Sequence, residues 1–208
     1  MVERPGDLVE GEDGLLRCWW ATVTPGMTAY HDVEWARGPR DERSLFERLS
    51  LEALQAGLSW RIVLERRGTL RSAFAGFAPE ELAGLTHADI ERILRFPGTI
   101  RNRAKVTAIV RNAAVLLDLH AQGSGLRTLT EDVLSAHRDA RREPPRHRTD
   151  VPTSTEASTA LARTLRRIGW RFVGPTTAYA YLQAVGWVDD HLVGCHARRA
   201  DRASDGLR

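Results

Sequence analysis

The segment RFVGPTTAYAYLQAVGWVDDHLVGC, residues 171–195, carries the strongest structural signals in the chain. Pro175 suits the first turn of a helix, because its φ is already fixed near the helical value and the missing N–H is not needed there. The small and apolar residues that follow it predict a helix over residues 175–186. Gly174 allows a tight turn immediately before that helix. The segment therefore predicts a turn that leads directly into a helix.

Helical patterns recur through the rest of the chain, whereas strand signals are few. Asp41 is a suitable N-cap and Gly57 a suitable end for one helix. Thr153 and Glu156 form a capping-box pattern that predicts the start of another, which ends at Gly169. The predicted helices span 41–56, 79–96 (two short helices, broken at Pro97-Gly98), 100–120, 153–168 and 175–186. With roughly eight helices in all, the predicted fold class is all-α.

Two Cys/His pairs stand near the two ends of the chain. Cys18 is followed by His31, and His191 is followed four residues later by Cys195. On a helix, the second pair would share one face. Two thiolates and two imidazoles suit tetrahedral zinc, and four protein ligands would make the site structural, since no position remains for a water. Judged on spacing alone, the metal site is the less favoured interpretation, since lone cysteines are more often small core residues.

Glu52 lies in an apolar stretch, LSLEALQAGLSW, in a chain with six tryptophans. It is either a solvent-facing helix residue or a buried functional acid. A buried carboxylate near the faces of aromatic rings would bind a flat, cationic, nitrogen-rich ring by cation–π attraction and a charge-assisted hydrogen bond. An alkylated purine nucleotide is such a ring. Trp19, Trp20, Tyr30 and Trp35 are the aromatic residues that cluster early in the sequence.

Arginine supplies almost all of the positive charge, because Lys105 is the only lysine among 30 basic residues. Arginine forks suit phosphate contacts, which favours a nucleic-acid partner. An excess of arginine can equally reflect a GC-rich genome. The net charge of only +3 therefore gives a weak indication by itself.

The organisation of the chain predicts one globular domain with loose ends. We expect an acidic tail over residues 1–15, a domain over 16–196 and a C-terminal tail over 197–208. Residues 137–150, HRDARREPPRHRTD, predict a mobile loop or, alternatively, a basic arm that touches DNA. No apolar stretch reaches the roughly 20 residues of a membrane span, and the N-terminus lacks an apolar signal core. The expectation is a cytoplasmic protein without a membrane segment or disulfide.

Six segments together resemble the 3-methyladenine DNA glycosylase I family, a branch of the helix-hairpin-helix glycosylases. They cover most of the chain between Arg17 and Cys195, in order and at compatible spacing. The resemblance implies an all-α helix-hairpin-helix fold whose termini are joined by a structural zinc site. The segments are RCWW (17–20), AYHDVEW (29–35), LFERLSLEALQAGLSWRIVL (45–64), GTIRNRAKVTAIVRNA (98–113), VPTSTEAS (151–158) and RFVGPTTAYAYLQAVGWVDDHLVGC (171–195).

The resemblance also implies roles for individual residues. Glu52 would contact the damaged base, and Leu58, set on Gly57, would fill the gap left by a flipped nucleotide. The aromatic residues of the base pocket would be Tyr30 and Trp60, with Trp20 and Trp35 nearby. The zinc ligands would be Cys18, His31, His191 and Cys195. The DNA-anchoring hairpin would be Phe172, Val173, Gly174, Pro175 and Thr176.

The implied activity is hydrolysis of the N-glycosidic bond of 3-methyladenine in double-stranded DNA, by a monomer working on the bacterial nucleoid. No lysine lies near the hairpin, so we expect a monofunctional enzyme without a Schiff-base lyase step. Three departures from the family pattern are Trp19, Met27 and Ala36, which replace a glycine, a tyrosine and a glycine. They leave two alternatives: a glycosylase for a bulkier alkylated purine, and a catalytically silent DNA-damage-binding protein.

Overall fold

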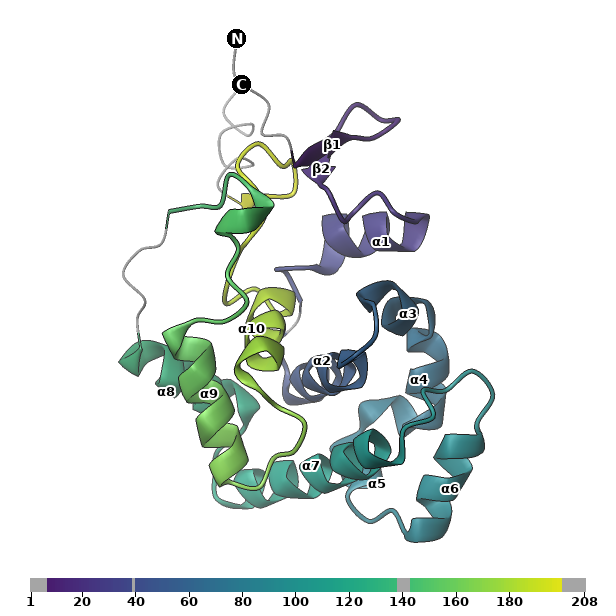
Figure 1. The fold of residues 1–208 in the computed structure, drawn as a ribbon. Coiled ribbons are helices and arrows are strands. Elements are labelled where there is room, and N and C mark those ends of the chain that lie inside the picture. The colour runs from purple at the N-terminus through teal and green to yellow at the C-terminus, as the bar shows by residue number, and fades with distance from the viewer. Residues whose placement is uncertain (1–6, 39, 138–142, 200–208) are drawn as a thin grey trace. The chain divides into compact units, whose positions relative to one another are not determined.

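The computed structural model describes residues 7–38, 40–137 and 143–199. These residues form two compact units. We call residues 7–38, 143–153 and 182–199 the terminal unit, and residues 40–137 and 154–181 the helical unit. Each is described by itself below, and Figure 1 traces the course of the chain through both. None of the helices in the described part of the chain is both long and apolar enough to span a membrane.

The described residues are mostly helical, as the sequence predicts. Two short strands and three further helical turns complete the regular structure of the described residues. The π-helical turn is Tyr30–Glu34, and the 3₁₀ turns are Ala75–Phe77 and Arg148–Asp150. The strands and α-helices are β1 (Leu8–Glu10), β2 (Leu16–Cys18), α1 (Pro25–Ala29), α2 (Glu42–Gln55), α3 (Trp60–Glu65), α4 (Arg67–Ala73), α5 (Pro79–Leu82), α6 (His87–Arg95), α7 (Arg103–Ala121), α8 (Leu126–Ala136), α9 (Glu156–Arg167) and α10 (Pro175–Ala184).

Helix α2 runs through the core of the helical unit, against α3, α7 and α8. All of its residues from Leu45 to Leu54 are buried, the charged ones included. Asp41 caps it as predicted, by accepting a hydrogen bond from the Ser44 amide. A helix buried on every side places its polar residues in an apolar setting, where each needs a partner or a function.

Two helix boundaries differ from the sequence prediction. Helix α9 begins two or three residues later than expected, because Thr155, not Thr153, forms the capping box, with Ser158. Helix α7 begins only after Asn102, whose side chain accepts a hydrogen bond from the Lys105 amide. Several hydroxyl and amide side chains stand near each start, so the local sequence did not single out the one that caps.

The terminal unit is built from segments at both ends of the chain. Strand β1 pairs antiparallel with β2, with Leu8 opposite Cys18, so residues 8–10 are not the loose segment expected. Around them lies a small core formed by Cys18, Leu192, Cys195 and Ala197, against which Leu8, Trp20 and Val151 pack. Local strand signals in a three-residue segment are too weak to reveal such pairing.

Part of the predicted basic loop 137–150 is also anchored in the terminal unit. The Val193 amide donates a hydrogen bond to the Pro145 carbonyl, and the Arg148 amide donates one to Asp7. Residues 138–142 of the predicted loop lie outside the described residues, as do 1–6 and 200–208 of the predicted tails. The described part of the loop is therefore attached to the unit rather than free of it.

Candidate functional site

Four predicted metal ligands come together in the terminal unit. Cys18, His31, His191 and Cys195 are all fully buried, and their ligand atoms lie within 4.8 Å of one another. The closest pair is His191 Nδ1 and His31 Nε2, which are 3.2 Å apart. Cys195 Sγ lies 3.4 Å from His31 Nε2 and 3.6 Å from His191 Nδ1. Donor atoms at the corners of a zinc tetrahedron are separated by roughly 3.3–3.8 Å, so these four residues fit one metal ion.

A carboxylate behind His31 fixes which ring nitrogen faces the cluster. His31 Nδ1 lies 2.7 Å from Asp32 Oδ1. Asp32 also accepts hydrogen bonds from Arg17 at 2.8–3.1 Å and lies 2.9 Å from His196 Nε2. Although burial opposes it, these partners hold the pKa of Asp32 well below its ordinary value. An ionised carboxylate only accepts, so Nδ1 carries the proton and Nε2 is left free to bind a metal.

The same contacts argue against a second cation site at His31, Asp32 and His196, although their donor atoms are also close together. The Arg17 guanidinium already lies against Asp32, at 2.8 Å. A metal ion beside it would face a fixed positive charge. We therefore interpret Asp32 as a support for the four-ligand cluster.

The backbone of the HLVGC segment does not form the expected helix. His191 to Cys195 form a turn, closed by the Cys195 amide on the Leu192 carbonyl, and not a helix. His31 lies in the π-helical turn Tyr30–Glu34, an uncommon geometry that is frequent at functional sites. The four residues that the family resemblance implied as ligands do lie together, although the local geometry expected for HLVGC was wrong.

Three of the predicted pocket aromatics pack together beside this cluster in the terminal unit. The Trp20 ring meets Trp35 edge-to-face at 5.0 Å and lies 6.3 Å from Tyr30. Trp20 and Trp35 also contact the His31 and His191 rings, at 5.1 and 4.6 Å respectively. The rings of two of the clustered residues therefore pack against these aromatic rings, which couples the two predicted sets of residues.

The three departures from the family pattern have different structural settings in the terminal unit. Trp19 is 36% exposed, whereas Met27 is buried. Ala36 is fully buried and has a φ of 61°. A left-handed backbone costs a residue with a Cβ roughly 1–2 kcal/mol, so the alanine is strained where a glycine would not be. Of the three, Ala36 is the substitution with a clear structural cost.

Glu52 is a buried acid in the helical unit, only 6% exposed on helix α2. Burial raises its pKa to about 8, and the positive charge of Arg48 one turn earlier only partly opposes that shift. Among the described residues, none donates a hydrogen bond to its carboxylate. The burial of Glu52 is therefore confirmed, whereas the solvent-facing interpretation is wrong.

Leu58 and Trp60 follow at the end of the same helix. Gln55 to Leu58 form a tight turn, in which Gly57 has a φ of 78° and the Leu58 amide donates to the Gln55 carbonyl at 2.6 Å. Leu58 is 37% exposed, a high value for a leucine. Trp60 begins α3 and is partly buried. The structure thus presents Leu58 to solvent on a defined turn.

The connection between α9 and α10 holds the predicted hairpin. Asn112 of helix α7 clamps its backbone at Arg171, accepting from the Arg171 amide at 2.8 Å and donating to its carbonyl at 3.1 Å. Phe172 has a φ of 55° and is 42% exposed. Val173 is buried, and Pro175 opens α10 as predicted, with the Ala178 amide bonding the Gly174 carbonyl. The hairpin is therefore a rigid feature of the helical unit.

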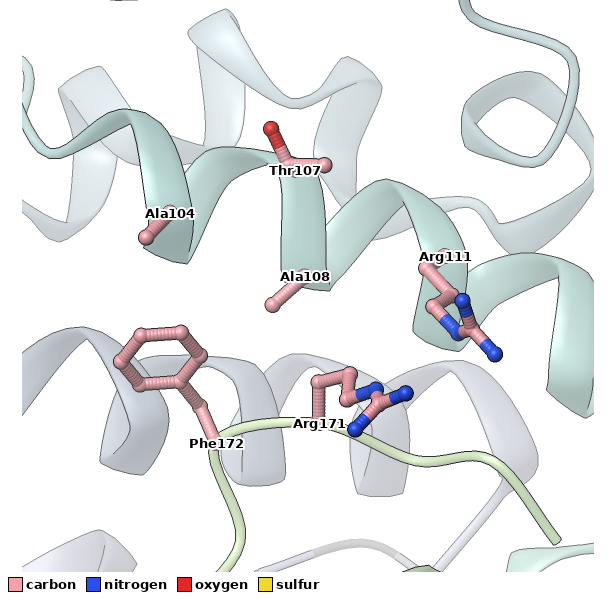
Figure 2. Close-up of a pocket in the computed structure, with 6 residues that line it drawn as sticks. All are labelled: Ala104, Thr107, Ala108, Arg111, Arg171 and Phe172. Carbon is pink, nitrogen blue, oxygen red and sulfur yellow. The ribbon is translucent and has the colours of Figure 1, made fainter.

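An open recess of about 470 Å³ lies between this hairpin and α7 (Figure 2). Figure 2 shows Phe172 facing the small side chains of the helix, with two arginine side chains beside them. Arg111 also donates a hydrogen bond to the Gly169 carbonyl at 3.2 Å. The residues that line the recess are Ala104, Thr107, Ala108, Arg111, Arg171 and Phe172, and none of them is acidic. An apolar floor with a positive rim suits the sugar-phosphate backbone of a nucleic acid.

A family model described as methyladenine glycosylase matches residues 20–199. The chain belongs to this family. It is 38% identical to the DNA-3-methyladenine glycosylase 1 of Escherichia coli K12, over 86% of this chain and 95% of that one. A crystal structure of 3-methyladenine DNA glycosylase I is similar, with a TM-score of 0.82, 38% identity, and coverage of 88% of this chain and 99% of that one.

A Staphylococcus aureus member of the methyladenine glycosylase family, from a study of 3-methyladenine recognition, has a TM-score of 0.78 and 33% identity. The two structures share 86% of this chain and 95% of the other. The similarity therefore extends over nearly the whole of each compared chain and includes both units described here.

Three supporting residues could not be predicted from the sequence. Asp32 was visible next to His31, but only the structure gives its three partners. Asn112 gave no local signal, because its contact is with a residue 59 positions away. Lys105 stands out in the sequence as the only lysine, which by itself indicates no role. All three act on the backbone or on another side chain, and such contacts have no sequence periodicity.

Proposed function

We infer that this protein is a DNA-3-methyladenine glycosylase, a hydrolase of base excision repair that removes 3-methyladenine from alkylated DNA. The inference rests on its membership of the methyladenine glycosylase family and on curated relatives of that name. The structural observation that carries it is Glu52, a buried carboxylate of raised pKa that accepts no hydrogen bond from any described residue. A buried acceptor of this kind suits a flat cationic base.

Glu52 recognises the base in the proposed mechanism. Methylation at N3 puts a positive charge on adenine, which weakens the bond between base and sugar. Glu52 accepts a hydrogen bond from the amino edge of the base, while Tyr30 and Trp60 stack on or frame its ring, with Trp20 and Trp35 in support. Water then adds to the sugar carbon as the neutral base leaves with the bonding electron pair, and the added water loses one proton to the solvent. Neutral adenine is a poor leaving group, so much of the selectivity comes from the substrate.

Binding to DNA is assigned to the two exposed turns of the helical unit. The α9–α10 connection acts as the hairpin of a helix-hairpin-helix motif, in which Val173, Gly174, Pro175 and Thr176 hold a phosphate with the free amides of the α10 start. Leu58 enters the stack of double-stranded DNA when the damaged nucleotide swings out, and Gly57 gives its turn the required backbone. One polypeptide supplies all of these groups, so we propose that a monomer is sufficient.

The metal in this proposal is a single structural zinc ion held by Cys18, His31, His191 and Cys195. Bound there, zinc would supply a closed tetrahedral crosslink and no activated water. Asp32 sets the tautomer of His31, and the ligand rings support Trp20 and Trp35 from behind. These residues act on the shape of the terminal unit and not on the departing base.

The direct test is release of 3-methyladenine from methylated genomic DNA, followed by chromatography. Glu52→Gln should reduce release by at least tenfold, because the amide loses the charge that pairs with the cation. Glu131→Gln, a matched change at an exposed position of α8, should have no effect. Circular dichroism and thermal unfolding of each variant would exclude loss of the fold as the cause.

Two results would redirect the assignment. Unchanged release by Glu52→Gln would remove Glu52 from the site. Failure of the folded protein to release 3-methyladenine would favour one of two alternatives: a glycosylase for a bulkier alkylated purine, or a catalytically silent DNA-damage-binding protein. An assay with DNA that carries bulkier alkylated purines distinguishes between them. A glycosylase for such adducts leaves abasic sites in that DNA, whereas a silent binding protein retains it without cleavage of any glycosidic bond.

A further inference from the structure

Lys105 is the only lysine among the 30 basic residues of the chain, and it is buried. It lies in the first turn of α7, and its side chain reaches the end of α2 within the helical unit. Its Nζ donates hydrogen bonds to the Leu54 carbonyl at 2.7 Å and to the Ala56 carbonyl at 2.5 Å. A buried ammonium thus holds two backbone oxygens, one on either side of the last residue of α2.

The second of these oxygens belongs to the turn that presents Leu58. Ala56 has φ −47° and ψ 115°, and Gly57 has a φ of 78°. With the hydrogen bond from the Leu58 amide to the Gln55 carbonyl, this geometry is that of a type II β-turn. Types I and II differ mainly in the direction of the peptide group between the two central residues. The Ala56 carbonyl is part of that peptide group, so a hydrogen bond to it selects between the two turns.

The chemistry of the side chain suits this task. A compact ammonium on a flexible stem can direct its protons to two convergent carbonyls, whereas a planar guanidinium presents its donors in a fixed fork. The position is also favourable for a positive charge, because the carbonyl end of α2 carries partial negative charge. Burial lowers the pKa of Lys105, so these contacts must offset a real desolvation cost. Although every other basic residue of this chain is an arginine, a lysine suits these two carbonyls better than an arginine would.

We propose that Lys105 is a positioning residue that locks the Gln55–Leu58 turn in its type II form, and thereby presets Leu58 for insertion into duplex DNA. The proposal rests on the function proposed above, in which Leu58 is the wedge. Without the ammonium, the central peptide can rotate and Leu58 samples several directions. Each productive encounter with DNA must then first order the turn, which lowers the rate of nucleotide flipping.

The test compares one lesion in two kinds of DNA, because a wedge is needed only where a stack must be held open. Genomic DNA is methylated either as the native duplex or after its strands have been separated, so that no methylated base is heated. The release of 3-methyladenine from each DNA is measured for Lys105→Met, which keeps the apolar stem without donors. We expect release from native DNA to fall by about tenfold to a hundredfold, with release from the strand-separated DNA changed by less than about threefold. A purely structural role would lower the two rates together.

Leu58→Ala provides the matched comparison, and it should give the same loss confined to native DNA. In the double variant, the losses should not multiply, since Lys105 acts through Leu58. Lys105→Arg should recover part of the native-DNA activity by keeping the charge. If Lys105→Met does not fold, Lys105→Gln is used instead. Its amide can still donate a hydrogen bond, so we expect a smaller loss of release that is again confined to native DNA.

Equal losses on both substrates, or multiplicative losses in the double variant, would overturn the role of Lys105. The Glu52→Gln variant distinguishes a failure of the Lys105 proposal from a failure of the proposed function. It should reduce release from both substrates, because base recognition is needed in each. If Glu52→Gln is fully active while Lys105→Met loses activity only on native DNA, the pocket assignment falls and the positioning role stands.

Discussion

At the scale of single residues, two buried glutamates on α2 show how the environment decides a role. Glu47 accepts hydrogen bonds from Arg67 and Arg71 at 2.7 and 2.8 Å. Although burial opposes it, these partners lower its pKa, so it is an ionised structural residue. Glu52 lies five residues later. Burial raises its pKa to about 8, and only the charge of Arg48 opposes that shift. The acid without a hydrogen-bonded partner is therefore the candidate for binding a ligand.

This raised pKa predicts a pH dependence of catalysis. The carboxylate that pairs with a cationic base must be ionised, and in the free protein Glu52 is mostly protonated below pH 8. The value of kcat/KM should therefore rise with pH by up to tenfold per unit and level off above about pH 8. The measurement is excision from methylated DNA over pH 5.5–9, at the roughly constant ionic strength that phosphate contacts require.

The Glu52→Gln variant is the control for this profile, because its amide does not titrate. Its residual activity should be nearly independent of pH over the same range. A wild-type profile that is flat, or that falls as the pH rises from 6 to 8, would contradict the role of an ionised Glu52 in the free protein.

At the scale of secondary-structure elements, the helical unit uses α7 to hold two turns in place. Lys105 near its start holds the turn after α2, and Asn112 two turns later clamps the connection between α9 and α10. A rigid helix of 19 residues is a suitable frame for two exposed loops, since loop geometry alone would be variable. Both predicted DNA contacts therefore depend on the same element.

The recess between α7 and the hairpin gives a prediction about DNA affinity. Replacing Arg171 with Gln should weaken binding to undamaged duplex DNA and reduce the slope of log affinity against log salt by about 0.9, the amount lost with one phosphate contact. Arg111→Gln should have a similar effect, with an added cost because its guanidinium also bonds the Gly169 carbonyl. Fluorescence anisotropy at several salt concentrations measures both the affinity and the slope.

Arg163→Gln serves as the matched control, because it removes one exposed arginine of α9 that does not line the recess. Its salt slope should equal that of the wild type. If all three variants lower the slope equally, the effect is one of overall charge, and the recess has no specific contact with the backbone of DNA.

At the scale of the whole molecule, the metal-ligand cluster ties together segments from the two ends of the chain. His31 and Cys195 are 164 residues apart, and the core around them is small. A small apolar core supplies little free energy of unfolding, so a bound metal would provide much of the stability of this unit. The helical unit has its own buried helix, α2, and does not contain these ligands.

Removal of the metal should therefore destabilise the terminal unit much more than the helical unit. After treatment with a zinc chelator, amides of β1, β2 and residues 191–197 should lose most of their protection from hydrogen exchange, while those of α2 and α7 change little. The melting temperature should fall by several degrees or more. Hydrogen exchange followed by mass spectrometry resolves the two units.

Cys18→Ser is the variant that tests the cause of this loss. It should already show the reduced protection of the terminal unit, and the chelator should have no further effect on it. A wild-type protein whose exchange and melting are unaffected by the chelator, at a measured zinc content of one ion per chain before treatment, would contradict a stabilising role of the metal.

The sequence by itself determined the helical character of this protein, the cap of α2 by Asp41 and the start of α10 at Pro175, and it singled out the four Cys/His residues that cluster. Helix periodicity and caps depend on residues three or four positions apart, so they can be read locally. These Cys/His residues were recognisable as candidate ligands because a rare set of residue types occurs in a pattern shared with a known family.

Only the tertiary structure decided that Glu52 is buried, that Asp32 orients His31, and that Lys105 holds the turn of Leu58. It also decided the pairing of β1 with β2, and the turn at HLVGC where spacing indicated a helix. Burial is set by neighbours from distant parts of the chain, and a hydrogen bond such as that of Lys105 to Ala56 spans 49 residues. Such contacts depend on how the elements pack, which local patterns of hydrophobicity and charge do not specify.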